Sequence, residues 1–336
     1  MARVLLLFGG RSAEHQVSCV SAAAVGEALR QAGHQVSAVG IDRDGGWHQA
    51  DTGRRPMVAE GPPAGFEVPA GSLRAPGGVV AFEVVFPVLH GPFGEDGALQ
   101  GMLEMAGVRY VGSGVLGSAI GMDKDVAKRL FRQAGLPTVA YQVVRGPDYA
   151  ADPGGVVGRV AERLGLPVFT KPARLGSSLG VTDAASEAEV KQGIEEALRH
   201  GDKVLVEEAV RGREIEVAVL EGPRASVPGE IVPTRGWYDY RAKYEDDSAI
   251  LLAPAPLTQA ESVRVRELAK QAFTVLECSG LARVDFFYEE GGRGFLLNEV
   301  NTMPGFTPIS MFPRLWQESG MSYPELVDEL VRLALQ

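Results

Sequence analysis

Apolar runs and amphipathic stretches alternate along the first third of the chain. The run from Arg3 to Phe8 is apolar throughout and predicts a buried parallel strand, which Gly9 and Gly10 end. The stretch from 50 to 78 holds many prolines and glycines with weak periodicity, so we expect irregular structure or a hairpin there. The remaining predictions for this third are helices at 15–31, 97–106 and 123–134 and strands at 36–41 and 84–89.

The rest of the chain continues the alternation of strand and helix. Two strands, 204–207 and 214–220, are expected to form a pair that meets around Arg211 and Gly212. The other predicted elements are helices at 154–165, 186–199 and 258–276, strands at 168–170, 282–288 and 294–300, and a final helix from 323. Such alternation predicts an α/β fold. A length of 336 residues favours two or three domains, with boundaries near 121 and 209.

Composition narrows the classes of protein that the pattern allows. The net charge of −10 argues against nucleic acid as a partner, and 45 % hydrophobic residues exclude a disordered chain. The only two cysteines, Cys19 and Cys278, exclude a disulfide framework. The apolar run at the amino terminus is too short for a signal peptide, and no apolar stretch reaches the length of a membrane helix. We therefore expect a soluble cytoplasmic protein.

Several common motifs for chemistry are missing or incomplete. The chain has neither the phosphate-binding pattern GxxxxGK[ST], nor a GxSxG elbow, nor an HExxH pair. A GxGxxG match at Gly112, Gly114 and Gly117 lacks an acidic residue about 20 positions on, because Asp123 and Asp125 come too early. This glycine segment is therefore interpreted as a flexible link or joint between domains.

Two loops concentrate polar residues directly after predicted strands. The segment 9–15 suits an anion or a polar ligand at a helix start, although Ser12 as an ordinary helix cap explains it as well. The segment 171–180 begins with Lys171 and continues with glycines and hydroxyls, which predicts a loop that closes over phosphate. The alternative is a flexible hairpin whose lysine reaches solvent.

A third group lies on the predicted strands at 282–288 and 294–300. Glu299 and Asn301 point to one face of their strand, and adjacent strands would bring them to Asp285. Carboxylates with one amide, and no soft ligand, select Mg²⁺ or Mn²⁺. A solvated strand face is the alternative, but the flanking residues are apolar. Beyond these strands, Gly305 offers a backbone N–H suited to an oxyanion, although a Pro-Gly turn explains the glycine equally well.

The segments that carry this chemistry resemble the D-alanine–D-alanine ligase family of the ATP-grasp superfamily, along almost the whole chain. The matching segments are GGRSAEHQVS at 9–18, HGPFGEDGALQG at 90–101, GMDK at 121–124, KPARLGSSLGV at 171–181, YDYRAKY at 238–244, GLARVDFF at 280–287 and LNEVNTMPGFTPIS at 297–310. The resemblance implies an α/β ATP-grasp fold of three domains. These are an N-terminal parallel-sheet (preATP-grasp) domain at 1–121 that binds substrate, a central ATP-grasp subdomain at 122–208, and a C-terminal ATP-grasp subdomain at 209–336 with the metal site.

The resemblance also assigns residues to roles. For substrate and catalysis it implies Glu14 at the first D-alanine's ammonium, Ser177 and Tyr244 bridging to Glu14, Arg283 and the backbone of Gly305 at the oxyanion, and Ser310 at the second carboxylate. For ATP it implies Lys124, Lys171 and Lys243 at the phosphates, Glu207 and Glu214 at the adenine amino group and ribose, and backbone contacts from Glu208, Ala209 and Val210. For two Mg²⁺ or Mn²⁺ ions it implies Asp285, Glu299 and Asn301.

The implied reaction joins two D-alanine molecules through an acylphosphate formed from ATP, for peptidoglycan precursors. Lys243 and Tyr244 favour an amine nucleophile over D-lactate, and D-serine as second substrate stays open. The resemblance further implies a homodimer, and the lack of an apolar stretch of membrane length predicts no membrane partner. Two other readings remain, a ligase for D-alanyl-D-lactate and a nucleotide-responsive binding protein without turnover. The intact set of Lys171, Arg283 and the metal candidates counts against the second.

Overall fold

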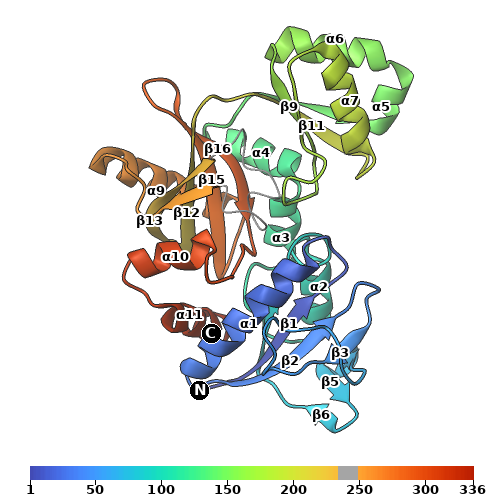
Figure 1. Cartoon of the computed structure of the whole chain (residues 1–336), viewed down its shortest axis with the longest axis vertical. Helices are drawn as coiled ribbons and strands as arrows, with labels where there is room; N and C mark the ends of the chain where they lie inside the picture. The colour runs from blue at the N-terminus through green and yellow to red at the C-terminus, as the bar shows by residue number, and fades with distance from the viewer. Residues whose placement is uncertain (234–248) are drawn as a thin grey trace.

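The computed structural model describes residues 1–233 and 249–336, and its strands form four sheets (Figure 1). The first sheet has the order β3-β2-β1-β7, in which β2 and β7 pair with β1 in parallel and β3 is antiparallel to β2. Its elements are β1 (Arg3–Gly9), α1 (His15–Gln31), β2 (Gln35–Ile41), β3 (Trp47–Gln49), β7 (Val84–Val88), α2 (Ala98–Met105) and α3 (Val115–Met122). The predicted α/β class with a parallel N-terminal sheet is confirmed.

The segment from 50 to 78 forms a small antiparallel sheet of its own. Its strands are β4 (Gly65–Glu67), β5 (Ser72–Ala75) and β6 (Gly78–Val80), with a 3₁₀ turn at Val68–Ala70. Leu73 is fully buried and joins the apolar cluster on one face of the parallel sheet. The expected hairpin is therefore present, and it covers that face.

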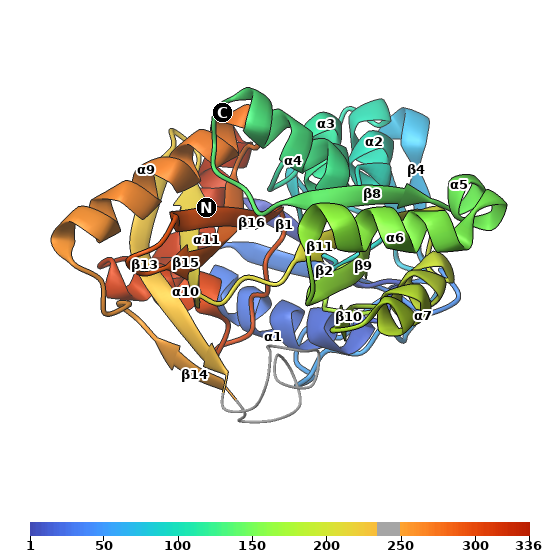
Figure 2. The same cartoon turned by 90° about the horizontal axis from the view of Figure 1, so that it is seen from above.

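A second four-stranded sheet, antiparallel and ordered β10-β9-β11-β8, lies apart from the first (Figure 1). The helices α6 and α7 lie against it (Figure 2). Its elements are β8 (Tyr141–Arg145), α5 (Gly146–Ala151), α6 (Pro153–Leu164), β9 (Val168–Pro172), β10 (Thr182–Ala184), α7 (Glu187–Leu198) and β11 (Lys203–Glu208). Ser186 and Glu189 form a reciprocal capping box at the start of α7, which fixes where the helix begins.

The largest sheet is antiparallel, five-stranded and ordered β14-β13-β12-β15-β16. It comprises β12 (Arg213–Leu220), β13 (Arg224–Pro233), β14 (Ala249–Leu252), β15 (Leu281–Glu289) and β16 (Gly294–Asn301). The helices around it are α4 (Lys124–Gln133), α9 (Gln259–Val275), α10 (Met311–Glu318) and α11 (Tyr323–Ala334). Ala127 and Phe131 of α4 belong to the core of this sheet rather than to that of the second sheet.

Two predictions about connections are wrong. β11 and β12 do not pair around Arg211 and Gly212, because β11 lies between β8 and β9 while β12 lies between β13 and β15. The chain crosses from one sheet to the other at this point. The segment after Gly112 is also no flexible link, since it continues into α3. A Cβ on Gly117 would meet the backbone oxygen of Glu277 at 2.8 Å, so α3 is packed closely against the end of α9.

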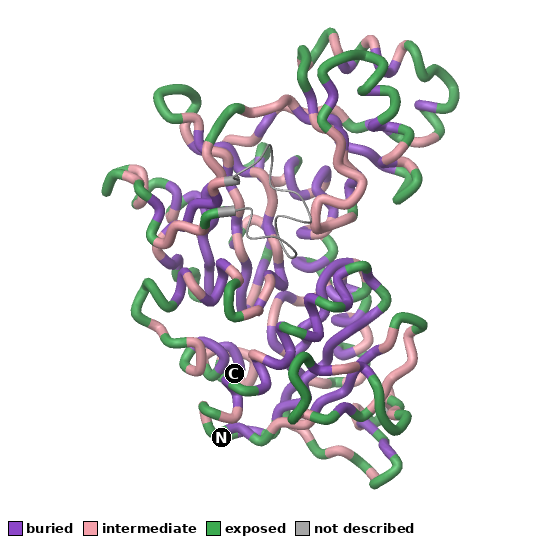
Figure 3. Tube along the Cα trace, in the orientation of Figure 1, coloured by how far each residue is buried: buried purple, intermediate pink, exposed green. Residues whose placement is uncertain are grey.

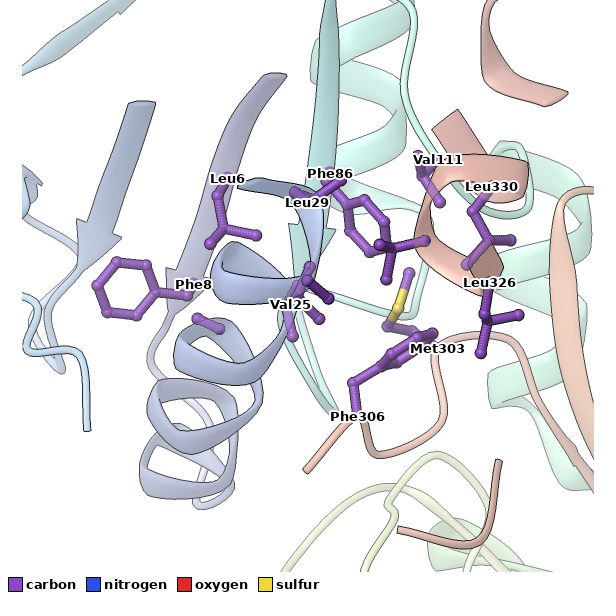
Figure 4. Close-up of a cluster of buried hydrophobic side chains, with 14 of the residues drawn as sticks. Leu6, Phe8, Val25, Leu29, Phe86, Val111, Met303, Phe306, Leu326 and Leu330 are labelled. Carbon is purple, nitrogen blue, oxygen red and sulfur yellow. The ribbon is translucent and has the colours of Figure 1, made fainter. Parts of the chain in front are cut away.

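The first and largest sheets share one continuous core. Leu6, Phe8 and Phe86 of the parallel sheet belong to the same cluster as Phe306 and Leu330 of the carboxyl-terminal part (Figure 4). Phe86 and Phe306 meet edge to face, with ring centroids 6.0 Å apart. The contact of α1 with α11 brings the two termini close together (Figure 1). Figure 3 shows that the buried strands run through the interior and that exposed residues lie mainly at the rim. None of the described helices is long and apolar enough to cross a membrane.

Candidate active site

The described residues line a cavity of about 900 Å³ where the parallel sheet, the loop after β9 and the largest sheet meet. Residues from distant parts of the chain contribute to its wall. Of the predicted site residues, the cavity gathers Glu14, Lys124, Ser177, Arg283, Glu299, Asn301, Gly305 and Ser310. Lys171, Asp285, the segment 207–210 and Glu214 lie outside this lining, and Lys243 and Tyr244 lie outside the described residues.

The metal candidates lie opposite one another on β15 and β16. Asp285 pairs with Glu299 in the register, and Asn301 donates from Nδ2 to Asp285 Oδ2 at 2.9 Å. The register shifts after Asp285, because Asn298 is an extra residue on β16. Such a bulge lets Leu297 turn to the core while Glu299 and Asn301 stay on the side of the cavity. The alternation of side chains and this bulge together produce an all-oxygen face.

The donor set on these strands fits Mg²⁺ or Mn²⁺. Two carboxylates and one amide offer hard oxygen ligands, and the side chains of Asp285 and Glu299 are only 13 % and 21 % exposed. Within the described residues no three His, Cys, Asp or Glu side chains cluster as a metal site, so the amide of Asn301 is needed to complete the set. Cations stand beside both acids, with Lys124 Nζ 3.4 Å from Glu299 Oε2.

Arg283 is held by carboxylates on two strands. Its guanidinium donates to both oxygens of Asp285, at 2.8 and 2.7 Å, and its Nε lies 3.1 Å from Glu216 Oε2 on β12. Two such contacts fix the orientation of a planar guanidinium. The sequence reasoning missed Glu216, although polar residues alternate with Ile215 and Val217 along β12 and gave a signal for it.

The predicted phosphate lysines Lys124 and Lys171 both have polar partners in the structure. Lys124 Nζ donates to the carbonyl oxygen of Leu175 at 2.8 Å, which ties the start of α4 to the loop after β9. Lys171 Nζ lies 2.7 Å from Glu207 Oε2 and donates to Asn298 Oδ1 at 3.3 Å. Lys171 thus connects the second sheet to the bulge of the largest sheet.

The segment from Glu207 to Val210 joins these two sheets. Glu208 and Ala209 donate their backbone N–H groups to the carbonyl oxygens of Ala140 and Pro167, at 3.0 and 3.1 Å. The Glu208 carboxylate accepts from the Ala140 N–H at 2.7 Å and pairs with Arg293. Of the predicted backbone contacts to a nucleotide base, an N–H donated by Glu208 or Ala209 would therefore compete with these bonds.

Glu14 meets the loop after β9 at the other side of the cavity. Ser177 donates its hydroxyl to Glu14 Oε1, and Ser12 Oγ accepts from the Glu14 N–H at 3.2 Å. Ser177 has a φ of 52°, in the left-handed region, where a serine costs free energy. Gly91 has a φ of +75°, which favours glycine, and a Cβ there would lie 2.5 Å from Glu14 Oε2 as it stands. The structure brings Glu14 and Ser177 together as the resemblance implied.

Two further polar residues of the cavity, His90 and Glu95, were not singled out as site residues. His90 Nδ1 lies 3.1 Å from the carbonyl oxygen of Met303, and burial lowers the pKa of His90. Glu95 Oε1 accepts from the Gly91 N–H at 2.6 Å. Burial, followed by the charge of Glu14, raises the pKa of Glu95 to about 8. Both lie in the segment HGPFGEDGALQG, which was the available signal.

Gly305 and Ser310 lie close together in the loop before α10. A Cβ on Gly305 would meet Ser310 Oγ at 2.9 Å, and this hydroxyl oxygen accepts from the Thr307 N–H at 3.0 Å. The loop is anchored by Phe306, which is fully buried and whose N–H donates to Ser21 Oγ at 3.3 Å. A rigid loop thus presents a side-chain-free backbone and a hydroxyl to the cavity.

Comparisons with known proteins agree along the chain. Residues 3–113 match the family model "D-ala D-ala ligase N-terminus", and residues 130–332 match "D-ala D-ala ligase C-terminus". The chain is 48 % identical to the D-alanine--D-alanine ligase of Streptomyces griseus subsp. griseus, with 99 % of this chain and 92 % of that relative covered. It is 44 % identical to the D-alanine--D-alanine ligase of Geobacillus kaustophilus, with 99 % and 95 % covered.

Solved structures resemble the whole chain. The D-alanine-D-alanine ligase from Coxiella burnetii has a TM-score of 0.87 at 34 % identity, covering all of this chain and 95 % of its own. The D-Ala:D-Ser ligase VanG from Enterococcus faecalis has the same TM-score at 32 % identity, covering 99 % of each chain. These likenesses confirm the predicted fold class.

Proposed function

The chain belongs to the D-alanine–D-alanine ligase family, and on this premise we propose that it joins two D-alanine molecules at the expense of ATP. The carboxylate of one D-alanine attacks the γ-phosphorus, the bond to ADP breaks, and an acylphosphate forms. The amine of a second D-alanine then attacks the carbonyl carbon, loses a proton, and expels phosphate. The dipeptide would serve peptidoglycan precursor synthesis. The observation that carries this proposal is the cavity in which Glu14, Arg283 and the Asp285–Glu299 strands converge.

The charges around the cavity suit this chemistry. Phosphoryl transfer depends mostly on positioning and on neutralising charge. We assign the phosphates to Lys124 and Lys171, with Lys243 outside the described residues as a further candidate. Arg283, whose guanidinium is oriented by Asp285 and Glu216, and the side-chain-free backbone of Gly305 both line the cavity and would stabilise the oxyanion.

Substrate binding is assigned to the two sides of the cavity. Glu14 would hold the ammonium of the first D-alanine, with Ser177 and Tyr244 bridging to it. Ser310 would anchor the carboxylate of the second. Glu207 and Glu214 would bind the adenine amino group and ribose, and the backbone of Glu208, Ala209 and Val210 would contact the base.

Asp285, Glu299 and Asn301 would hold two Mg²⁺ or Mn²⁺ ions. Bound there, such ions would neutralise phosphate charge during transfer. The residues of the chain perform the remaining tasks of binding, orienting and excluding water. An acylphosphate is hydrolysed by bulk water, so the loop after β9 has the further task of covering the cavity.

Phosphate release and product mass test the reaction. With ATP, Mg²⁺ and D-alanine we expect phosphate in step with D-alanyl-D-alanine. Separate reactions with L-alanine, D-serine plus D-alanine, and D-lactate plus D-alanine determine the specificity. Release with L-alanine and none with D-alanine would overturn the substrate assignment. Absence of release with every substrate would favour a nucleotide-binding protein without turnover.

D-serine is tested separately as a competing nucleophile. A structure of similar fold is a D-Ala:D-Ser ligase, so D-serine is the strongest rival to the second D-alanine. We expect the dipeptide D-alanyl-D-alanine to dominate when both amino acids are supplied at equal concentration. If D-alanyl-D-serine were the main product, the proposed activity would be wrong and the protein would be a D-alanine–D-serine ligase.

We also propose a cytoplasmic homodimer. Two buried cysteines without a disulfide suit a reducing compartment. Light scattering coupled to size-exclusion chromatography tests the dimer, for which twice the chain mass of 35.7 kDa is expected. Elution as a monomer at micromolar concentration would contradict it.

A further inference from the structure

Lys128 is a buried lysine that the sequence patterns did not distinguish. It lies on α4 one turn after Lys124, and its side chain is 0 % exposed. A buried ammonium is costly unless a carboxylate faces it. Its partner is Glu207 of β11, whose Oε1 lies 3.1 Å from Lys128 Nζ.

Glu207 is shared between two lysines. Its second oxygen, Oε2, lies 2.7 Å from Lys171 Nζ, while its side chain is only 4 % exposed. Lys171 is less deeply buried, at 11 % exposed, and also reaches Asn298. The three charged groups form a chain that begins inside the protein at Lys128 and ends at Lys171, on the side of the proposed nucleotide.

The chain of charges connects two bodies of the fold. Lys128 belongs to α4, whose neighbouring Ala127 and Phe131 lie in the core of the largest sheet. Glu207 and Lys171 belong to neighbouring strands of the second sheet, in which Glu207 pairs in register with Phe169. The position of Glu207, and through it that of Lys171, therefore depends on a helix anchored in the other sheet.

The charges also keep the shared carboxylate ionised. Burial by itself would raise the pKa of Glu207. The charges of Lys128 and, second, Lys171 lower this pKa by more than burial raises it, so it lies below its ordinary value. When Lys171 turns to a phosphate, Glu207 needs another cation. Lys128 is placed to be that cation, since burial leaves it no route to solvent.

We propose that Lys128 is a positioning residue of the nucleotide site, which holds Glu207 and through it directs Lys171 toward the phosphates. This inference rests on the proposed function in that it assigns Lys171 to the nucleotide. It goes beyond that function by adding a residue that touches neither substrate nor phosphate. The competing explanation is that Lys128 and Glu207 form a purely structural ion pair. In that case Lys128→Met lowers the unfolding temperature but leaves ADP binding unchanged.

A double-mutant cycle separates the two explanations. ADP binding in the presence of Mg²⁺ is measured by calorimetry for the wild type, Lys128→Met, Glu207→Gln and the double variant, with thermal unfolding recorded for each. We expect Lys128→Met to weaken ADP binding by roughly tenfold, the usual scale for losing a contact to a charged group. In the Glu207→Gln background the same substitution is expected to change binding by less than about twofold.

A matched control uses the same substitution on the surface. Lys191 is exposed on α7 of the same sheet, and Lys191→Met is expected to bind ADP as the wild type does. Wild-type ADP binding by folded Lys128→Met would overturn the proposal. So would an equal loss in the two Glu207 backgrounds, because Lys128 would then act without Glu207.

The experiment also holds if Lys128→Met fails to fold. Lys128→Gln, which keeps a polar side chain beside Glu207, then takes its place in the cycle, and the losses of ADP binding in the two Glu207 backgrounds are compared in the same way. ADP binding needs no D-alanine, so a wild type that binds ADP but releases no phosphate with D-alanine would contradict only the proposed function. The result of the cycle would still decide the role of Lys128.

Discussion

The floor and the covering loop of the cavity are built in opposite ways. On the floor, Arg283, Glu299 and Asn301 come from paired strands whose register fixes their neighbours. In the covering loop after β9, Ser177 has a left-handed conformation and donates its hydroxyl to Glu14, and the carbonyl oxygen of Leu175 accepts from Lys124 Nζ. A fixed register suits groups that must stabilise charge at a set place. A loop held by side-chain hydrogen bonds rather than by a strand register suits a part that must open for substrates.

The largest expected effect on turnover comes from a substitution on the floor of the cavity. Glu299→Gln keeps the size of the side chain and removes one charge of the metal face and the partner of Lys124. We expect turnover to fall by at least about 10²-fold, because charge neutralisation carries most of phosphoryl transfer. The steady-state rate of phosphate release measures the loss.

The control for this change is Glu318→Gln, on the exposed end of α10. It should leave turnover and the unfolding temperature unchanged. If folded Glu299→Gln turned over at nearly the wild-type rate, Glu299 would take no part in the chemistry. The contrast between the floor and the loop would then be wrong.

A lysine at the border of the two regions comes next. Lys171 is the next-to-last residue of β9, just before the loop, and donates to Asn298 of β16, the strand that carries Glu299. For Lys171→Ala we expect kcat/KM for ATP to fall by about 10²-fold without unfolding, since a charge-assisted contact is lost. Initial rates at varied ATP concentration measure this.

The matched variant here is Lys191→Ala on α7, where the side chain is exposed. Its kcat/KM for ATP should equal that of the wild type. If Lys171→Ala changed kcat/KM for D-alanine but not for ATP, Lys171 would act with the loop rather than on the nucleotide.

A substitution in the loop after β9 is expected to have a smaller effect, on KM more than on kcat. Ser177→Ala removes the bond to Glu14, and we expect KM for D-alanine to rise by about tenfold while kcat changes less. Ser177→Gly loses the same hydroxyl but relieves the positive φ of 52°. Equal KM values in the two variants would show that the hydroxyl matters. A recovery with glycine alone would instead assign the effect to backbone strain.

The smallest expected effect concerns pH. Burial and the charge of Glu14 raise the pKa of Glu95 to about 8, above its ordinary 4.5. Between these values the folded state holds a proton that the unfolded state has lost. Stability contributed by this group is therefore complete below about pH 4.5 and declines as the pH rises through 8, by at most about 1.4 kcal/mol per pH unit.

Urea unfolding of the wild type and Glu95→Gln between pH 5 and 8 measures this slope. The variant should show a shallower decline, because it has no proton to lose. Glu318→Gln should follow the wild type. Identical slopes for wild type and Glu95→Gln would contradict the raised pKa of Glu95.

Sequence reasoning reached much of the fold and of the floor. Apolar runs placed β1, β15 and β16, and period-two alternation put Glu299 and Asn301 on one face. It did not find Glu216 or Lys128. Both are charged residues inside amphipathic segments, where the pattern of neighbours also suits a solvent-facing side chain.

The sequence by itself determined the class of fold, the family and the residue types of the site. These depend on local spacing, which a strand or helix converts directly into a face. Only the tertiary structure decided that β11 and β12 lie in different sheets and that Glu207 lies between Lys128 and Lys171. The physical reason is that periodicity sets the direction of a side chain but not its partner. The partner is set by which elements pack together, and those elements are far apart in the chain.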